Sequence, residues 1–198
     1  MIGGVFRLLR GGPAGVSHGD SLSAGGFTNL ESVMVIDDAR SWIEALDARD
    51  VTFWVDGGWG VDALLGEQIR PHDDLDLVVG AHHEPVVLDL LRERGCAEVP
   101  MSLSTSFHSV WRGDAGREVD LHMIAMDDQG NGQFGPDDVY PAAGLQGRGS
   151  IGRRAVRCIT AQVQLEFHLG YDHDEDDRAD VWALCRRFGL PFPAHYQG

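Results

Sequence analysis

Hydrophobic residues recur along the chain with two different spacings, one typical of helices and the other of strands. Apolar positions three and four residues apart predict helices over residues 32–49, 59–65, 83–94, 161–168 and 174–188. Short apolar or alternating runs predict strands over residues 51–55, 74–79, 96–99, 107–112, 117–124 and 154–159. The order of these elements predicts an α/β protein in which helices pack on a sheet.

Two of the predicted strands carry acidic residues at alternating positions. Successive side chains of a strand point to opposite faces, so Asp74 and Asp76 share one face while the leucines between and after them enter a core. On the strand 117–124, Asp120 and His122 share a face in the same way. If the two strands pair, Asp120 completes a trio of carboxylates. Adjacent carboxylates repel one another unless a cation lies between them, and hard oxygen ligands suit Mg²⁺.

A pair of glycines precedes the first of these strands. Gly57 and Gly58 separate a predicted strand from a predicted helix, where exposed backbone N–H groups favour phosphate oxygens. Arg70 is a candidate phosphate clamp, with a surface ion pair to Asp73 as the alternative. His72 could orient Asp74, touch phosphate or have a structural role. Together these features predict a site for a metal-chelated nucleoside triphosphate.

The glycine pair followed by Asp-x-Asp at residues 74–76 resembles the signature of the polymerase-β-type nucleotidyltransferase superfamily. The strings Asp-Gly-Gly-Trp-Gly-Val-Asp at 56–62 and Arg-x-His-x-Asp-x-Asp at 70–76 are similar, more narrowly, to the antibiotic nucleotidyltransferases, namely the lincosamide nucleotidyltransferases and the aminoglycoside 2''-adenylyltransferases. The resemblance runs from about residue 52 to residue 193. It departs from many relatives at Asp176, where they have lysine.

The resemblance implies an α/β (α+β) fold, with a mixed nucleotidyltransferase β-sheet, flanking helices and a small C-terminal helical portion. It implies transfer of AMP from ATP or another NTP to a hydroxyl of a small antibiotic, a lincosamide first and an aminoglycoside second, with two Mg²⁺ ions as cofactors. The residues assigned on this basis are Asp74, Asp76 and Asp120 as metal ligands and catalytic residues, Gly57, Gly58, Arg70 and His72 for the nucleotide, and Glu166 and Tyr171 for the substrate. Asp120 could hold a metal ion, accept the hydroxyl proton, or do both.

The charge of the chain limits its partners. With 31 acidic and 16 basic residues, the 198-residue chain has a formal net charge of −15, which repels nucleic acid and favours a small cationic antibiotic. Three cysteines without a CxxC spacing predict free thiols in the cytoplasm, and no apolar run is long enough for a membrane helix. A homodimer is possible. Alternative functions are nucleotidyl transfer to a protein or RNA partner, as in toxin–antitoxin relatives, and non-catalytic nucleotide binding.

Composition and the family resemblance together predict three parts. Residues 1–30, rich in Gly and Ser, read as a disordered leader; residues 31–130 form the catalytic core, and residues 131–198 a helical portion beside the substrate cleft. Residues 127–149 are rich in Gly, Asp and Pro, which predicts a long connection with little packing. In the last helix the predicted core stripe is Val181, Leu184, Cys185 and Phe188.

Overall fold

The computed structural model describes residues 33–100, 105–113, 115–169 and 174–196, so the predicted leader and Tyr171 lie outside the described residues. The helices are α1 (Ile36–Asp47), α2 (Gly57–Leu65), α3 (Glu84–Glu93), α4 (Ala161–Phe167) and α5 (Glu175–Phe188). The strands are β1 (Phe53–Val55), β2 (Asp74–Gly80), β3 (Ala97–Val99), β4 (His108–Arg112), β5 (Glu118–Met126), β6 (Gly132–Phe134), β7 (Asp138–Tyr140), β8 (Gly147–Ile151) and β9 (Arg154–Cys158).

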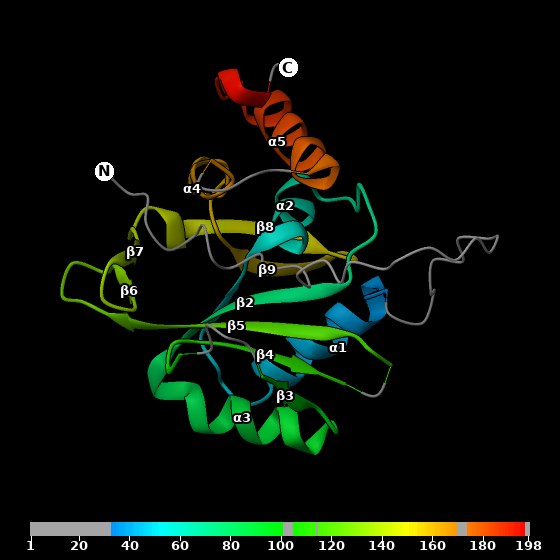
Figure 1. Ribbon diagram of the computed structural model, residues 1–198, viewed down its shortest axis with the longest axis vertical. Coiled ribbons are helices and arrows are strands. Elements are labelled where there is room, and N and C mark those ends of the chain that lie inside the picture. The colour runs from blue at the N-terminus through cyan, green and yellow to red at the C-terminus, as the bar shows by residue number, and fades with distance from the viewer. Residues whose placement is uncertain (1–32, 101–104, 114, 170–173, 197–198) are drawn as a thin grey trace, which may run out of the picture.

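The strands form one mixed sheet with the order β3-β4-β5-β2-β1-β9-β8, and β6 and β7 extend it from β5. The pairs β2–β5 and β1–β9 are parallel, and the other pairs are antiparallel. Helices α1 and α3 cover one face, and α2, α4 and α5 gather on the side away from α3 (Figure 1). The predicted mixed sheet with flanking helices is therefore confirmed. The boundary expected near residue 130 falls between β5 and β6, within this sheet.

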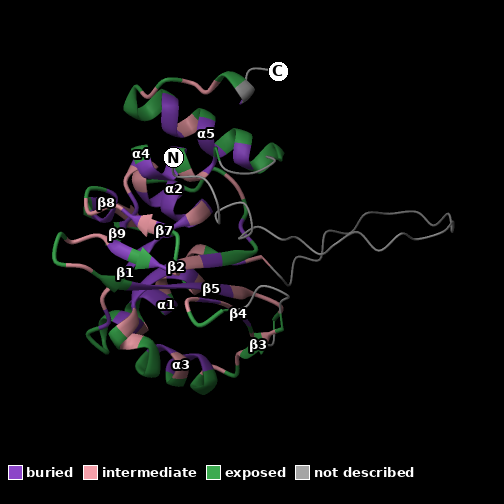
Figure 2. Ribbon diagram, turned by 60° about the vertical axis from the view of Figure 1, so that its left-hand side comes forward, coloured by how far each residue is buried: buried purple, intermediate pink, exposed green. Residues whose placement is uncertain are grey.

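The alternation of side chains in β2 and β5 divides the core into two clusters. Leu75, Leu77 and Leu121 belong to the larger cluster, which α1 and α3 cover. Val78 and Ile124 point the other way into a second cluster. The helix predicted over residues 32–49 is α1, and its buried residues follow the predicted spacing. Figure 2 shows that buried residues are concentrated in the sheet and the faces of the helices that touch it.

The segment 127–149 differs from its prediction. It contains β6 and β7, and the side chains of Phe134 and Tyr140 are almost completely buried in the second cluster. Composition suggested a loop because Gly and Asp dominate it, but two aromatic side chains bury enough apolar surface to fix the hairpin. The strand predicted over residues 154–159 is β9, which forms a hairpin with β8 in which Ile151 pairs with Arg154.

Helix α5 ends the fold much as its sequence predicts. Asp174 caps the helix with a reciprocal bond to Asp177, and Gly189 ends it in a left-handed conformation with a φ of 67°. Val181, Leu184 and Cys185 are buried, but Phe188 is exposed, so its assignment to the core stripe is wrong. Among the described helices, none has the length and apolar character needed to cross a bilayer.

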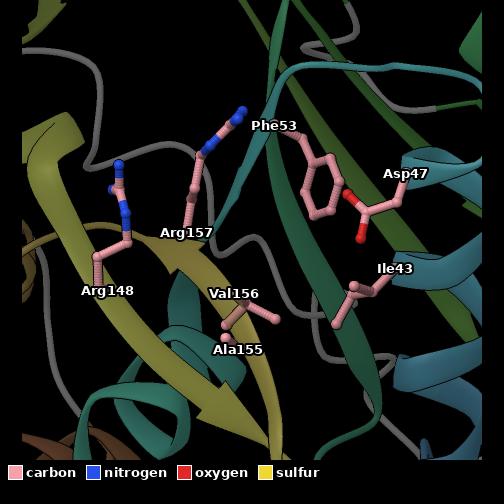
Figure 3. Close-up of a pocket in the computed structure, with 7 residues that line it drawn as sticks. All are labelled: Ile43, Asp47, Phe53, Arg148, Ala155, Val156 and Arg157. Atoms are coloured by element: carbon pink, nitrogen blue, oxygen red, sulfur yellow. The ribbon is translucent and has the colours of Figure 1, made fainter.

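A pocket between α1 and the β8–β9 hairpin lies apart from the predicted site. Figure 3 shows Arg148 and Arg157 pointing the same way at one side of this pocket, with Ile43 and Phe53 at the other. The two arginines are direct partners in the hairpin register. None of the site residues predicted from the sequence lines this pocket.

Candidate active site

The two acid-bearing strands are neighbours, so the pairing that a trio of carboxylates requires is present. Parallel pairing of β2 with β5 places Asp76 directly beside Asp120, and Asp74 beside Glu118. Because Leu75 and Leu121 enter the core on one face, Asp74, Asp76 and Asp120 share the opposite face. Exposure increases along this row: Asp120 is buried, Asp76 is half-buried and Asp74 is exposed. The row therefore runs from the protein interior to the solvent, with hard oxygen donors along it.

The start of α2 lies against this row. The helix begins at Gly57, two residues earlier than predicted, because the Asp56 side chain caps it by accepting a hydrogen bond of 2.9 Å from the Gly57 N–H. Gly57 has a φ of +55°, and a Cβ at this position would overlap Oδ2 of Asp76. Glycine thus allows the positive end of a helix to lie directly beside a carboxylate of the row.

Gly58 has a similar close approach to the loop that precedes β2. A Cβ on Gly58 would overlap the ring of His72 and the guanidinium of Arg70. The structure therefore brings all four residues predicted to bind the nucleotide to the first turn of α2.

Arg70 and His72 are both held by carboxylates. Arg70 donates two hydrogen bonds, of 3.0 and 2.8 Å, to the fully buried Asp180 of α5, and also contacts Asp176 at 3.5 Å. The ring of His72 contacts Asp62 of α2 at 2.5 Å. These contacts fix the loop before β2 against α2 and α5. Asp176 adds a second carboxylate beside Arg70.

A buried polar network supports the interior end of the acid row. The Tyr140 hydroxyl donates to Asp56 at 2.9 Å and lies 2.6 Å from Nδ1 of His122. Burial, with the nearby carboxylates of Asp56, Asp76 and Asp120, raises the pKa of Tyr140 well above its usual value. Burial lowers the pKa of His122, although the carboxylates of Asp120 and Asp56 oppose this shift. Both shifts favour the uncharged forms of Tyr140 and His122.

Sequence reasoning missed two residues of this region. His108 lies opposite His122 in the β4–β5 register, and its Nε2 is 2.9 Å from Oδ1 of Asp120. The other missed residue is Tyr140. A lone histidine in a predicted strand and a tyrosine in a Gly-rich segment have no sequence signal that reveals these contacts, which depend on strand register.

The two residues predicted for the substrate lie differently. Glu166 is exposed on α4 and accepts a hydrogen bond of 2.9 Å from Gln162. Its role in substrate binding stays a prediction, as does that of Tyr171, which is outside the described residues. On the same helix, Phe167 packs edge-to-face on Tyr140 at 5.2 Å between ring centres, so α4 borders the buried network.

Breaking the Arg70–Asp180 pair should destabilise the fold. Burial alone would raise the pKa of Asp180, but the nearby His168 and the hydrogen bonds from Arg70 lower it below its usual value. An Arg70→Ala variant leaves a buried carboxylate without its main partner, so we expect the free energy of unfolding to fall by about 3 kcal/mol at pH 7. The control variant Arg187→Ala removes an exposed arginine, so its free energy of unfolding should fall by less than about 0.5 kcal/mol. Urea unfolding of both variants measures this difference.

The same pair predicts how stability depends on pH. A carboxyl whose pKa is lower in the folded state stabilises the protein above its unfolded pKa of about 3.9, and this contribution is lost as the pH falls through the lower folded pKa. The pKa of Asp180 rises when Arg70 is removed. In Arg70→Ala the stabilising contribution of Asp180 should therefore be lost at a higher pH than in the wild-type protein. Identical pH profiles of unfolding for both proteins would contradict the role given to Arg70.

Fold and site together define a nucleotidyltransferase, with an acid row on paired strands and a glycine-rich helix start beside it. The profile of the aminoglycoside-2''-adenylyltransferase family matches residues 39–184, and the chain belongs to this family. A lincosamide resistance protein from Staphylococcus haemolyticus is 32% identical over 148 residues, covering 70% of this chain and 87% of that protein. A 2''-aminoglycoside nucleotidyltransferase from Escherichia coli is 49% identical, but only over 35 residues.

Solved structures agree with this assignment. The crystal structure of the lincosamide antibiotic adenylyltransferase LnuA, with lincomycin bound, aligns with a TM-score of 0.66 at 28% identity and covers 78% of this chain and 98% of LnuA. ANT(2'')-Ia in complex with adenylyl-2''-tobramycin aligns with a TM-score of 0.63 at 18% identity, covering 78% and 89% of the two chains, and shows the shared fold. The resemblance stated from the motifs is thus confirmed, and the chain is an antibiotic-type nucleotidyltransferase.

Proposed function

We propose that this enzyme transfers AMP from ATP to a hydroxyl group of a lincosamide antibiotic in the presence of Mg²⁺ and thereby inactivates the drug. The pairing of Asp76 with Asp120, beside the start of α2, is the observation that carries the proposal. It gives a divalent cation hard oxygen donors and gives phosphate oxygens the positive end of a helix. If these carboxylates were only a solvated strand face, α2 would not need to approach Asp76 so closely that position 57 must be glycine.

Each acid has a distinct place in the proposed mechanism. Asp74 and Asp76 would hold Mg²⁺ together with the triphosphate, and Asp120 would complete the set. Bound magnesium supplies charge neutralisation on the phosphate oxygens.

Gly57 and Gly58 leave room for the backbone of α2 to approach the β- and γ-phosphates. Arg70 and His72 shape the loop beside this position, and direct contact of either with phosphate stays a prediction.

The transfer itself replaces one phosphorus–oxygen bond by another. The drug hydroxyl oxygen forms a bond to the α-phosphorus of ATP while the bond from that phosphorus to the α–β bridging oxygen breaks, and pyrophosphate leaves. The hydroxyl proton must go to a base, and Asp120 is the carboxylate of the row that lies deepest. Asp120 could serve as base, as metal ligand, or as both.

Sequence coverage supports a lincosamide as the acceptor. The match to the lincosamide resistance protein spans most of both chains, whereas the match to the aminoglycoside enzyme spans 35 residues. An aminoglycoside 2''-hydroxyl is the second candidate, because the matching family profile is that of the aminoglycoside-2''-adenylyltransferases. The net charge of −15 suits both classes, since their members carry protonated amines.

A panel of drugs tests the proposal. The protein is incubated with ATP, Mg²⁺ and either a lincosamide or an aminoglycoside, and the products are analysed by mass spectrometry and a pyrophosphate assay. The proposal predicts that lincomycin gains the mass of one AMP residue and that one pyrophosphate is released per drug. A gain only on aminoglycosides favours the second candidate. If no drug is modified and no pyrophosphate forms, the proposed function is wrong.

A further inference from the structure

Three buried polar atoms face one another at the interior end of the acid row. Nε2 of His108, Nε2 of His122 and Oδ1 of Asp120 all lie within 4.8 Å of one another. The Asp120 oxygen is 2.9 Å from His108 and 3.5 Å from His122. Within the described part of the chain, none of these three atoms forms a hydrogen bond, because even the 2.9 Å contact lacks the required orientation. Buried polar atoms normally have partners, so this arrangement needs an explanation.

The register of the sheet builds the arrangement. His108 of β4 and His122 of β5 are direct partners in an antiparallel pair, which places their side chains on the same face. Asp120 lies two residues before His122 and therefore shares this face. The Phe134 ring packs 4.9 Å from the His122 ring between centres and helps to cover the group. All three residues are more than nine-tenths buried.

Tyr140 determines which nitrogen of His122 carries the proton. The single hydroxyl proton of Tyr140 is donated to Asp56, so the Tyr140 oxygen accepts from Nδ1–H of His122 at 2.6 Å. A neutral imidazole with its proton on Nδ1 has a lone pair on Nε2, which is the atom that faces Asp120. A lone pair beside a carboxylate oxygen is repulsive unless a cation lies between them.

We infer that His108, Asp120 and His122 form a binding site for one transition-metal ion such as Zn²⁺ or Co²⁺. Two imidazoles, one carboxylate and an open fourth position are a ligand set typical of four-coordinate zinc. Bonds of about 2.0 Å in a tetrahedron place neighbouring donor atoms about 3.3 Å apart, close to the 2.9 and 3.5 Å that separate the Asp120 oxygen from the two histidines. The Asp56–Tyr140–His122 chain is the kind of outer support that orients metal-binding histidines.

This site would share Asp120 with the proposed magnesium site while using different chemistry. Imidazole nitrogens select transition metals, whereas the outer acids Asp74 and Asp76 offer only oxygen. Binding of the transition metal does not depend on the proposed transfer function, because it requires neither nucleotide nor drug. The two claims therefore fail separately.

Titration with Co²⁺ tests the inference. The full-length protein, freed of any affinity tag and of metal, is titrated while the visible absorption of four-coordinate Co²⁺ is followed, and Zn²⁺ is then added as a competitor. We expect one Co²⁺ per chain, displaced by Zn²⁺. His108→Asn should weaken binding by more than about 100-fold, and Tyr140→Phe by about 10–100-fold, as expected for an outer-shell partner. Asp76→Asn should leave the cobalt spectrum unchanged.

A surface histidine pair provides the matched control. His82 and His83 lie in direct sequence with ring centres 3.9 Å apart, outside the proposed site. Replacing both by asparagine should leave Co²⁺ affinity within about twofold, as expected for removal of surface groups outside the site. If this double variant abolishes the spectrum, or if Asp76→Asn does, the ion binds elsewhere and the inference is wrong.

X-ray absorption on the wild-type protein with Zn²⁺ avoids any effect of the variants on folding. Two imidazole ligands in a four-coordinate shell support the site. A shell of oxygen ligands alone, or no binding of Zn²⁺ at one equivalent, would overturn it.

Discussion

An Asp76→Asn variant is expected to lose AMP transfer almost completely, with a fall in kcat of about 1,000-fold or more. The change removes one charged oxygen ligand from the acid row, and metal-assisted charge neutralisation contributes several kcal/mol to such a transition state. The fold should be retained, because Asp76 is half-buried and contributes no core volume. Removing one negative charge from this row of three acids should, if anything, raise the free energy of unfolding. Steady-state kinetics and urea unfolding measure both effects.

Asp73→Asn is the matched control for this result. Asp73 is exposed and precedes the acid row by one residue, so the same chemical change is made at almost the same place in the chain. Its kcat should stay within about twofold of the wild-type value, as expected for surface substitutions. Equal losses in the two variants would show that general surface charge matters, and near-normal activity of Asp76→Asn would refute the site.

The second large effect concerns Gly57, where a single methyl group should disable the site. A Cβ at this position would overlap the Asp76 carboxylate, which must move or force α2 away. A displacement of about 1 Å in such a site can cost 100-fold in rate, so we expect kcat of Gly57→Ala to fall by at least about that factor. The φ of +55° adds strain of about 1 kcal/mol to the folded state.

Gly189→Ala separates these two causes. Gly189 has a φ of +67° at the end of α5, and a Cβ there would meet nothing within 4 Å. The variant therefore carries the same backbone strain without the overlap. Its unfolding free energy should fall by about 1 kcal/mol, as for Gly57→Ala, while its kcat stays within about twofold. Comparable kinetic losses in both variants would contradict the role of the close approach at Gly57.

The sequence predicted those parts of the site that depend on local spacing. Alternation along residues 74–79 and 117–124 placed the three acids on the correct faces, because a strand fixes side-chain direction once its register with the core is known. The glycine pair marked the turn between β1 and α2, although the helix begins at Gly57 and not at residue 59 as predicted. These predictions needed no knowledge of distant contacts.

Contacts between distant segments could not be predicted in this way. Arg70 reaches Asp180, 110 residues later, and His108 meets Asp120 through the register of β4 and β5. The hairpin of β6 and β7 depends on the burial of Phe134 and Tyr140 against a face made by other strands. Neither composition nor periodicity contains that information, because tertiary packing outweighs local preference in such segments.

The position of the radioactive label after reaction tests the central claim most directly. ATP labelled at the α-phosphate and ATP labelled at the γ-phosphate are each incubated with the enzyme, Mg²⁺ and lincomycin, and the drug is separated from nucleotide and pyrophosphate. The acid row and the glycine-lined helix start predict that the α-label appears on the drug, the γ-label appears in pyrophosphate, and EDTA abolishes both. A γ-label on the drug, or α-label transfer that persists in Asp76→Asn, would contradict the account.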